Sequence, residues 1–470
     1  MTRYEQIARD LERLIASGSL RAGDKAPSVR KLHRTTGASV STILHAYALL
    51  ERAELIEARE RSGFVIKARL QRQELPTCPR VPLRVRSVEV PALVSALVEA
   101  GREPSLAPFG TAVQSPELLP GEQLARIVRA LSRDNVAAAL AYEFPPGSIK
   151  LRRQIARRSI DWGCALSADD LVITSGCVEA LQLCLRAIVK AGDVVAVESP
   201  TCYGVLYGIF HSLKLRVLEL PTDPQEGLVL SALHAALGKM KIAACLLVPN
   251  FNNPLGSVMP DAKKQEIVEL LARRNVPLIE DDIYADLHFG ASRPKPAKAF
   301  DRKGLVLLCS SFSKTIAPGY RIGWSAPGRF AEAVRRLKFT SSVAAPTLPQ
   351  MALAEFLGTS GYDRHLRLTR ARLFAQMSDL SEAVARNFPS GTRMTHPQGG
   401  LVLWVELPGR ADATDLYRRA LEEGIGIAPG PIFSSQPRYQ KFIRLNFGYP
   451  LTPQLERAIV RLGSLAHELA

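Results

Sequence analysis

Short apolar runs alternate with helical patterns over most of this chain, from about residue 91 to its end. The runs are Leu171–Ile173, Val194–Val197, Leu215–Leu218, Ala244–Val248, Pro277–Ile279 and Leu305–Leu308. Strands that alternate with helices form an α/β domain with a largely parallel sheet. Such sheets bind ligands at the carboxyl ends of their strands. The alternation therefore predicts an α/β domain over residues 91–470, with its candidate ligand site where these runs end.

The first 67 residues have a different pattern. Apolar residues near the N-terminus recur at helical spacing: Ile7, Leu11, Leu14 and Ile15. A second helix opens at Pro27 or Ser28 and ends at Gly37, and Ser39 is a suitable N-cap for a third. Two short β-prone runs, Leu55–Ile56 and Phe64–Ile66, then flank a polar stretch. Three helices followed by a hairpin predict a winged helix-turn-helix, mainly α with a β wing.

The charge distribution of this small domain points to an anionic partner. The chain has a formal net charge of +16, and no Asp or Glu occurs from Lys25 to Leu50. Basic side chains attract the phosphates of nucleic acids, although a plain solvated basic face has the same composition. Short hydroxyl side chains at the start of the third helix suit bonds to phosphates or base edges; they are Ser39, Ser41 and Thr42.

A longer motif covers the same domain. The pattern Y-x-Q-I-x-x-x-L-x-x-x-I-x-x-G-x-L-x-x-G-x-x-x-P-S-x-R-x-L runs from Tyr4 to Leu32, with A-Y-x-x-L and S-G-F-x-I downstream. Residues 1–67 thereby resemble the DNA-binding domain of GntR-type regulators. Ala26 is a departure, since Leu usually precedes the Pro-Ser pair. The resemblance implies double-stranded promoter DNA as a partner, contacted by Arg30, Ser39, Ser41, Thr42, Arg61 and Gly63.

Residues 68–90 are rich in proline and arginine and have little periodicity, which predicts a linker. Four of the arginines in this range are either additional DNA contacts or ordinary solvated side chains; these four are Arg72, Arg80, Arg84 and Arg86.

The strongest chemical signal in the large domain is centred on Lys314. The run Ser310-Ser311-Phe312-Ser313-Lys314 follows an apolar run, and Arg321 comes seven residues later. A lysine that forms an imine must be partly neutral, which positive neighbours and desolvation favour. The hydroxyls of Ser311 and Ser313 and the guanidinium of Arg321 suit a dianionic phosphate.

Three further motifs follow other predicted strands. Asp281 and Tyr284 offer a carboxylate and a hydroxyl from one loop, as a pyridinium nitrogen and a phenolate oxygen require. Asn253, before a proline, offers a second donor to the phenolate oxygen. Ser175-Gly176-Cys177 opens a predicted helix, and a helix N-terminus with glycine favours phosphate. Each motif alone also fits an ordinary turn or helix cap.

The joint order of the motifs is more specific. G-x-x-E-A-L, N-P-x-G, D-x-x-Y, S-x-S-K and R-x-G occur in succession, which resembles fold-type I enzymes, in particular class I/II aminotransferases. The resemblance implies pyridoxal 5′-phosphate held at Lys314 as a Schiff base. It assigns cofactor contacts to Tyr142, Ser175, Gly176, Cys177, Tyr203, Asn253, Asp281, Tyr284, Ser311, Ser313 and Arg321. Tyr142 is expected to reach the phosphate of a partner subunit, and Arg444 to hold the carboxylate of an amino compound.

One position departs from the aminotransferase pattern. Where the family has an aromatic ring over the cofactor, Pro200-Thr201-Cys202 presents a cysteine, with Tyr203 one residue later. Either Tyr203 stacks on the cofactor or the stacking ring is missing. Cys177 and Val178 also occupy positions that often carry polar side chains.

A GntR-like head joined to an aminotransferase-like body resembles the MocR subgroup of bacterial regulators. This resemblance implies a homodimeric, pyridoxal 5′-phosphate-dependent transcriptional regulator that responds to a small amino compound. The alternative is a working aminotransferase with a DNA-binding head, and whether transamination occurs stays open. A third interpretation is a DNA-binding protein with an inactive body.

Other classes of protein fit less well. No apolar run is long enough for a membrane span, and the N-terminus lacks the apolar stretch of a signal peptide. The seven cysteines are scattered without a C-x-x-C pair, which predicts neither a metal site nor a disulfide framework. We therefore expect a cytoplasmic protein without a metal.

Overall fold

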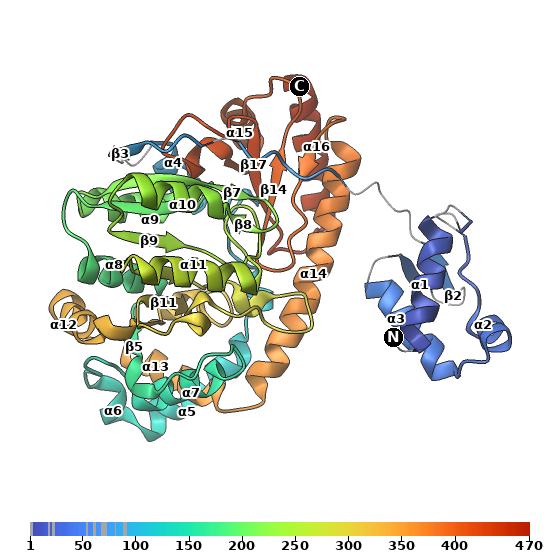
Figure 1. Ribbon diagram of the computed structural model, residues 1–470. Coiled ribbons are helices and arrows are strands. Elements are labelled where there is room, and N and C mark those ends of the chain that lie inside the picture. Colours follow the sequence, from blue (N-terminus) through green and yellow to red (C-terminus); the bar gives the residue numbers. More distant parts are fainter. Residues whose placement is uncertain are drawn as a thin grey trace. The chain divides into compact units, whose positions relative to one another are not determined.

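The computed structural model describes residues 3–16, 19–20, 24–52, 55–59, 63–66, 73–79, 81–87 and 92–470. The chain divides into two units, Met1–Gln73 and Glu74–Ala470, shown in Figure 1. The second unit thus begins inside the range that the sequence assigns to a linker. Within that range Arg84 and Arg86 are exposed, whereas Arg72 and Arg80 lie outside the described residues.

The first unit has the predicted order of three helices and a hairpin. The helices are α1 (Arg3–Ala16), α2 (Val29–Thr36) and α3 (Val40–Arg52), and β1 (Ile56–Arg59) pairs antiparallel with β2 (Gly63–Ile66). Ser28 caps α2 by accepting a hydrogen bond from the Lys31 backbone N–H at 3.2 Å. The capping hydroxyl thus fixes where the second helix begins.

The structure adds two local details of this unit that the sequence analysis did not specify. Leu14 is 43 % exposed, because Ile7, Leu11 and Ile15 already form the inner face of α1. Strand β1 extends through Arg59, so most of the polar stretch after Ile56 pairs with β2 instead of forming a loop.

The second unit is built on a mixed central sheet in the order β3-β7-β6-β9-β10-β11-β12-β5, with β8 paired to β7. Its strands are β3 (Val85–Ser87), β5 (Val172–Thr174), β6 (Val194–Ser199), β7 (Arg216–Asp223), β8 (Gly227–Leu228), β9 (Ala244–Leu247), β10 (Leu278–Asp281), β11 (Val306–Ser311) and β12 (Gly323–Ala326). The five strands from β7 to β11 run parallel, and β12 is antiparallel to both neighbours. The prediction of an α/β domain with a largely parallel sheet is confirmed.

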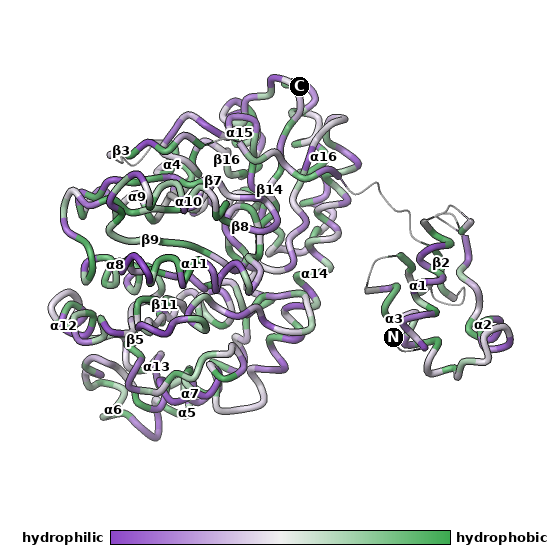
Figure 2. The backbone as a smooth tube through the Cα atoms, in the orientation of Figure 1, coloured by the Kyte–Doolittle hydropathy of each residue, from purple (hydrophilic) through white to green (hydrophobic). Residues whose placement is uncertain are grey.

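Helices cover both faces of this sheet. One face packs on α8 (Cys177–Ile188), α9 (Tyr203–Ser212) and α12 (Ala331–Ser342), and the other on α10 (Leu230–Lys239) and α11 (Asp261–Arg273). Strands buried on both faces are mostly apolar, and β9 is apolar throughout, as its green trace shows in Figure 2. Burial on two faces explains why these strands appear in the sequence as continuous apolar runs.

A smaller sheet of four strands forms the C-terminal part of the second unit. Its order is β13 (Arg393–Met394), β14 (Val402–Glu406), β17 (Phe442–Asn446) and β16 (Ala428–Pro429), and β15 (Ile425–Gly426) pairs separately with β4 (Ala107–Pro108). The long α14 (Gly361–Asn387) runs along this part, together with α15 (Ala413–Glu422) and α16 (Pro453–Leu469) (Figure 1). The remaining helices are α4 (Ala92–Ala100), α5 (Gly121–Asp134), α6 (Val136–Leu140), α7 (Ile149–Ser159) and α13 (Thr347–Leu357).

The start of the second unit is fixed to this smaller sheet. We call residues 74–79 the anchor segment. The Met394 backbone N–H donates to the Glu74 carbonyl at 3.0 Å. The backbone N–H and the hydroxyl of Thr77 donate to the two oxygens of Glu406, at 2.7 and 3.0 Å. Glu406 is buried at the end of β14, so the chain that leaves the first unit is tied to a strand of the second.

Among the residues that the structure describes, no helix is both long and apolar enough to cross a membrane. The same residues contain no cluster of three or more His, Cys, Asp or Glu side chains with the arrangement of a metal site.

Candidate functional site

The motifs from the large domain converge where the parallel strands end. Asp281 ends β10, Ser311 ends β11, and Asn253 lies in the loop after β9. These strands are adjacent and parallel, so their carboxyl ends share one edge of the sheet. The loops after β10 and β11 add Tyr284 and Lys314 to the same edge.

Lys314 is held between polar groups in a partly enclosed position. Its Nζ donates to the carbonyl of Ala112 at 2.7 Å, and its own carbonyl accepts from Gln114 Nε2 at 2.6 Å. Removal from water lowers the pKa of Lys314 to about 8; the Arg444 charge acts in the same direction, and Asp281 opposes it. A lysine that is half neutral near this pH is an effective nucleophile towards carbonyl groups.

Asp281 is a buried carboxylate with an incomplete set of partners. It accepts a hydrogen bond from Cys177 Sγ at 3.4 Å. Burial raises the pKa of Asp281 to about 6, while the hydrogen bond from Cys177 and the charge of Lys314 lower it. A carboxylate in this state is stabilised by an additional cationic N–H donor, and a protonated pyridine nitrogen is such a donor.

A hydrogen-bonded row crosses the site from Tyr284 to Arg444. Asn253 Nδ2 donates to the Tyr284 hydroxyl at 3.4 Å, and Arg444 Nη1 donates to Asn253 Oδ1 at 3.1 Å. Arg444 is 5 % exposed and its Nη2 donates to the carbonyl of Gly110, while its Nε has no acceptor among the described residues. A buried guanidinium bonded only to neutral oxygens favours an incoming carboxylate, which offers charge and two acceptors.

Arg321, two serines and the start of α8 form an anion-binding cradle. Arg321 Nη1 donates to Ser313 Oγ at 3.5 Å and its Nη2 donates to the Ser175 carbonyl at 3.4 Å. The Ser313 backbone N–H donates to Ser311 Oγ at 3.3 Å. Helix N-termini carry free backbone N–H groups and a partial positive charge, which favours phosphate.

Glycine at the cap of α8 is required by this cradle. Gly176 has φ +88°, and a Cβ there would collide with the guanidinium of Arg321. Gly323, on the neighbouring strand β12, approaches the backbone of Gly176 so closely that a Cβ would also collide. Because Gly176 and Gly323 have no side chains, the Arg321 guanidinium can lie directly against the N-terminus of α8.

The segment Gly110–Gln114 was not predicted and lies directly over the site. Its carbonyls at Gly110 and Ala112 accept from Arg444 and Lys314, the two cations of the site. Asn446, at the end of β17, holds the segment by donating to the carbonyls of Pro108 and Val113. Gln114 adds a side-chain contact, since its Nε2 donates to the carbonyl of Lys314. The contacts with the two side-chain cations come from backbone carbonyls, which carry no mark in the sequence.

Cys202 and Tyr203 are the two candidates for the position over the cofactor ring, and the structure locates the side chain of Cys202. Cys202 is the N-cap of α9 and is partly exposed. Burial raises the pKa of its thiol, while the charges of Arg444 and Lys314 lower it, so Cys202 lies within the site. The side chain of Tyr203 lies outside the described side chains, and its stacking role stays a prediction.

Tyr142 is separate from these groups. Its side chain is 73 % exposed and its ring packs on that of Phe144, with 5.6 Å between the ring centroids. Its expected contact with the phosphate of a partner subunit stays a prediction.

The predicted DNA contacts of the first unit gather around the start of α3. Ser39 Oγ lies 2.9 Å from Ser41 Oγ and 2.7 Å from Thr42 Oγ1. Arg30 is exposed near the start of α2, and Gly63 is exposed at the start of β2. Arg61 lies outside the described residues.

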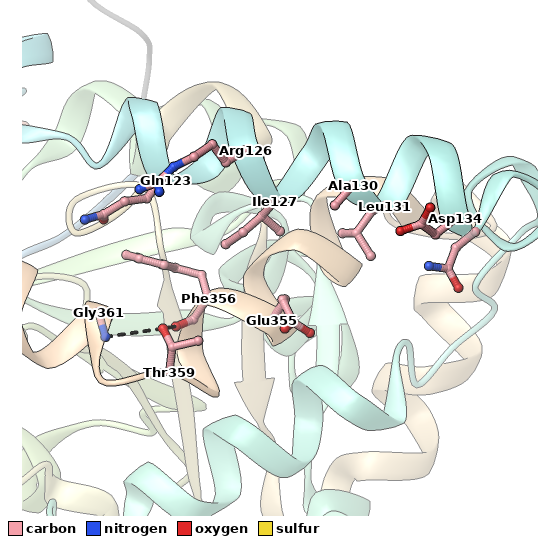
Figure 3. A pocket seen from close by; sticks show the side chains of 11 residues that line it. Gln123, Arg126, Ile127, Ala130, Leu131, Asp134, Glu355, Phe356, Thr359 and Gly361 are labelled. Carbon is pink, nitrogen blue, oxygen red and sulfur yellow. Dashed lines mark hydrogen bonds between the residues drawn. The ribbon is translucent and has the colours of Figure 1, made fainter.

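A cavity of about 600 Å³ lies apart from these groups, between α5 and the end of α13. Ile127 and Leu131 of α5 and Phe356 of α13 face it, as Figure 3 shows. None of the predicted site residues lines it. We therefore assign the chemistry to the strand ends and not to this cavity.

Comparison with known proteins agrees with the two units. Residues 119–462 match the family described as aminotransferase class I and II, and residues 3–66 match bacterial regulatory proteins of the gntR family. The chain is 40 % identical over 469 residues to "Uncharacterized HTH-type transcriptional regulator YdcR" of Escherichia coli (strain K12), covering 100 % of each.

Two solved structures resemble the second unit. One is LysN, an α-aminoadipate aminotransferase from Thermus thermophilus complexed with N-(5′-phosphopyridoxyl)-L-leucine. It has 27 % identity and a TM-score of 0.74 and covers 81 % of this chain and 95 % of its own. The other is the Pyrococcus horikoshii kynurenine aminotransferase in complex with PMP. It has 27 % identity and a TM-score of 0.75 and covers 80 % of this chain and 95 % of its own.

The reactivity of Lys314 is expected to depend on pH with a midpoint near 8. Above its pKa the amine is neutral and nucleophilic, so acetylation of Lys314, followed by mass spectrometry, should rise as the pH passes 8. Asp281→Asn removes a charge that favours the ammonium, which should move the midpoint down by about one unit. Arg444→Gln removes an opposing charge and should move it up. A midpoint near the ordinary lysine value of about 10.4 in all three proteins would contradict this electrostatic account.

Proposed function

Since this chain belongs to the class I and II aminotransferase family and carries a gntR-family DNA-binding domain, as MocR-type regulators do, we propose that it is a transcriptional regulator controlled by an amino compound at Lys314. The observation that carries the proposal is the meeting of Lys314, Asp281 and Arg444 in a chain whose first residues form a winged helix-turn-helix. The promoter is the proposed DNA partner, and a homodimer is the proposed assembly.

The residues of the site fit pyridoxal 5′-phosphate. Among the described residues Asp281 has no cationic N–H donor, Arg321 and two serines form a cradle suited to an anion, and Lys314 is partly neutral near pH 8. Asn253 and Tyr284 would hold the phenolate oxygen, and Ser175, Gly176, Cys177, Ser311, Ser313 and Arg321 the phosphate. When bound, this cofactor supplies an aldehyde that condenses with primary amines and an electron-withdrawing ring.

Arg444 would bind the carboxylate of the amino compound. The carbonyls of Gly110 and Ala112 accept from the donors of Arg444 and Lys314. A ligand carboxylate is a stronger acceptor than the Gly110 carbonyl, because it is charged and binds two N–H groups at once. Ligand binding would therefore release the Gly110–Gln114 segment from Arg444.

The smaller sheet gives this change a route towards the first unit. Arg444 lies on β17, directly opposite Trp404 of β14, and Glu406 two residues further along β14 holds Thr77 of the anchor segment. A shift of β14 and β17 on ligand binding would therefore reach the segment that follows the DNA-binding domain. Differential binding energy of this kind can shift a conformational equilibrium, typically by about 5- to 150-fold.

A working aminotransferase is the second candidate function. It is favoured by the complete set of Lys314, Asp281, Tyr284 and Arg444. Transamination and regulation are compatible in one protein, because both begin with an amino compound at the same lysine.

DNA binding is expected to be sequence-specific and to change with ligand. In gel-shift assays with fragments from upstream of its own gene cluster, the full-length protein should prefer one fragment, with an affinity that changes on adding pyridoxal 5′-phosphate. Arg30→Ala should weaken binding to every fragment, with a salt dependence reduced by about one counterion. The absence of a sequence-specific shift under all conditions would refute the proposal.

Transaminase activity is tested by half-reactions with a panel of amino acids. We expect spectral changes when an amino compound binds, with slow or no conversion to the pyridoxamine form. Lys314→Ala should abolish retention of the cofactor after borohydride reduction. Rapid conversion to the pyridoxamine form together with normal regulation in Lys314→Ala would favour the enzyme as the main function.

The anchor segment is expected to couple the two units. Glu406→Ala removes the acceptor of both Thr77 hydrogen bonds, so the ratio of DNA affinities with and without ligand should fall towards one. The control is Glu266→Ala, which removes an exposed carboxylate from α11. Ligand affinity in the absence of DNA, followed by absorbance, should be unchanged in both variants. An unchanged ratio in Glu406→Ala would exclude this route.

A further inference from the structure

The helix α3 exposes two branched apolar side chains on its outer face. Val40 is 50 % exposed and Leu44 is 47 % exposed, and residues four apart lie one above the other on a helix. The inner face of the same helix is formed by Ile43, Tyr47 and Leu50, all fully or almost fully buried. Val40 and Leu44 therefore do not belong to the core of the first unit.

The surroundings of this pair suit DNA. Ser39, Ser41 and Thr42 bring three hydroxyls to the same end of α3, and the stretch from Lys25 to Leu50 contains no acidic residue. If two copies of this chain met through this face, two basic stretches without acidic residues would lie against each other. Their like charges would repel, which disfavours a second copy as the partner. A polyanion with some apolar surface fits the charge and the exposed side chains together.

Valine and leucine side chains cannot take part in hydrogen-bonded base recognition. The edges of unmodified base pairs in the major groove present donors, acceptors and one apolar group, the 5-methyl group of thymine. We propose that Val40 and Leu44 contact thymine methyl groups in the major groove, so that the DNA site of this protein contains A·T pairs at the positions facing these two side chains. This inference rests on the proposed DNA binding and adds the base that α3 selects.

The experiment removes single methyl groups from the DNA. A duplex is first selected from a randomised pool with the full-length protein, and each thymine in it is then replaced by deoxyuridine, which keeps every hydrogen-bonding group. Burial of one methyl group is worth about a four-fold change in affinity, so we expect at least one replacement to weaken binding by about that factor. Val40→Ala or Leu44→Ala should bind the thymine duplex more weakly and lose the sensitivity to that replacement.

Two control variants separate base contacts from other effects. Lys31→Ala removes an exposed charge on α2; it should weaken binding to thymine and deoxyuridine duplexes equally. Leu368→Ala removes a side chain that is 57 % exposed on α14 of the second unit; it should change neither affinity. Alanine at positions 40 and 44 lies on an exposed helix face and is a strong helix former, so the first unit should fold in both test variants.

The outcomes are distinct from those that test the proposed function. If no duplex is selected, DNA binding itself fails. If a duplex is selected but no replacement weakens binding, or if both alanine variants keep the full sensitivity, the inference about thymine is overturned. It is also overturned if Val40→Ala or Leu44→Ala changes the oligomeric state in sedimentation experiments, because a second copy then covers these side chains.

Discussion

Burial of charge at one edge of the parallel sheet is the constraint on which the site depends. Removing an ion from water costs several kcal/mol, so each buried charge needs compensation. Behind the site, Arg293 pairs with Asp282 and Asp286 and lies over the ring of Trp162. The charged groups of the site have neutral partners instead: Asp281 has a thiol and the backbone N–H of Ile283, Arg444 an amide and a carbonyl, and Lys314 a carbonyl. Ligand groups can therefore replace neutral partners by charged ones.

The sequence predicted the parts of this arrangement that follow from local pattern. Motifs at the ends of apolar runs, such as Asp281 and Lys314, converge because parallel strands end at one edge. The Gly110–Gln114 segment was not predicted, because it meets the side chains of Arg444 and Lys314 through backbone carbonyls that every residue possesses, and a single buried glutamine, Gln114, does not mark a site. The helical spacing of Ile7, Leu11, Leu14 and Ile15 predicted the helix, but not that Leu14 would stay exposed while the other three enter the core.

The two cysteines of the site bear on the choice between sensing and turnover. Burial raises the pKa of Cys202 and, more strongly, that of Cys177, so both remain neutral thiols at physiological pH. The two thiols therefore line the site as small neutral side chains and do not act as nucleophiles. An aromatic ring at position 202 would add stacking on a bound cofactor, whereas a thiol leaves that face less constrained. If Tyr203 does not supply the ring instead, the reacting groups are less well oriented, and rate depends on that orientation more strongly than binding does.

The proposed coupling between ligand and DNA would depend on the stiffness of the smaller sheet. Arg444 and Glu406 lie on neighbouring strands joined by five residue pairs, and Trp404 between them is buried against Phe433 and Phe442. A close-packed sheet of this kind moves as a body, because small displacements inside it would open voids or clashes. A ligand that displaces Arg444 would therefore displace β14 and β17 together. In the proposed coupling, the hydrogen bonds from Thr77 to Glu406 would carry that movement to the anchor segment, which follows the DNA-binding domain in the chain.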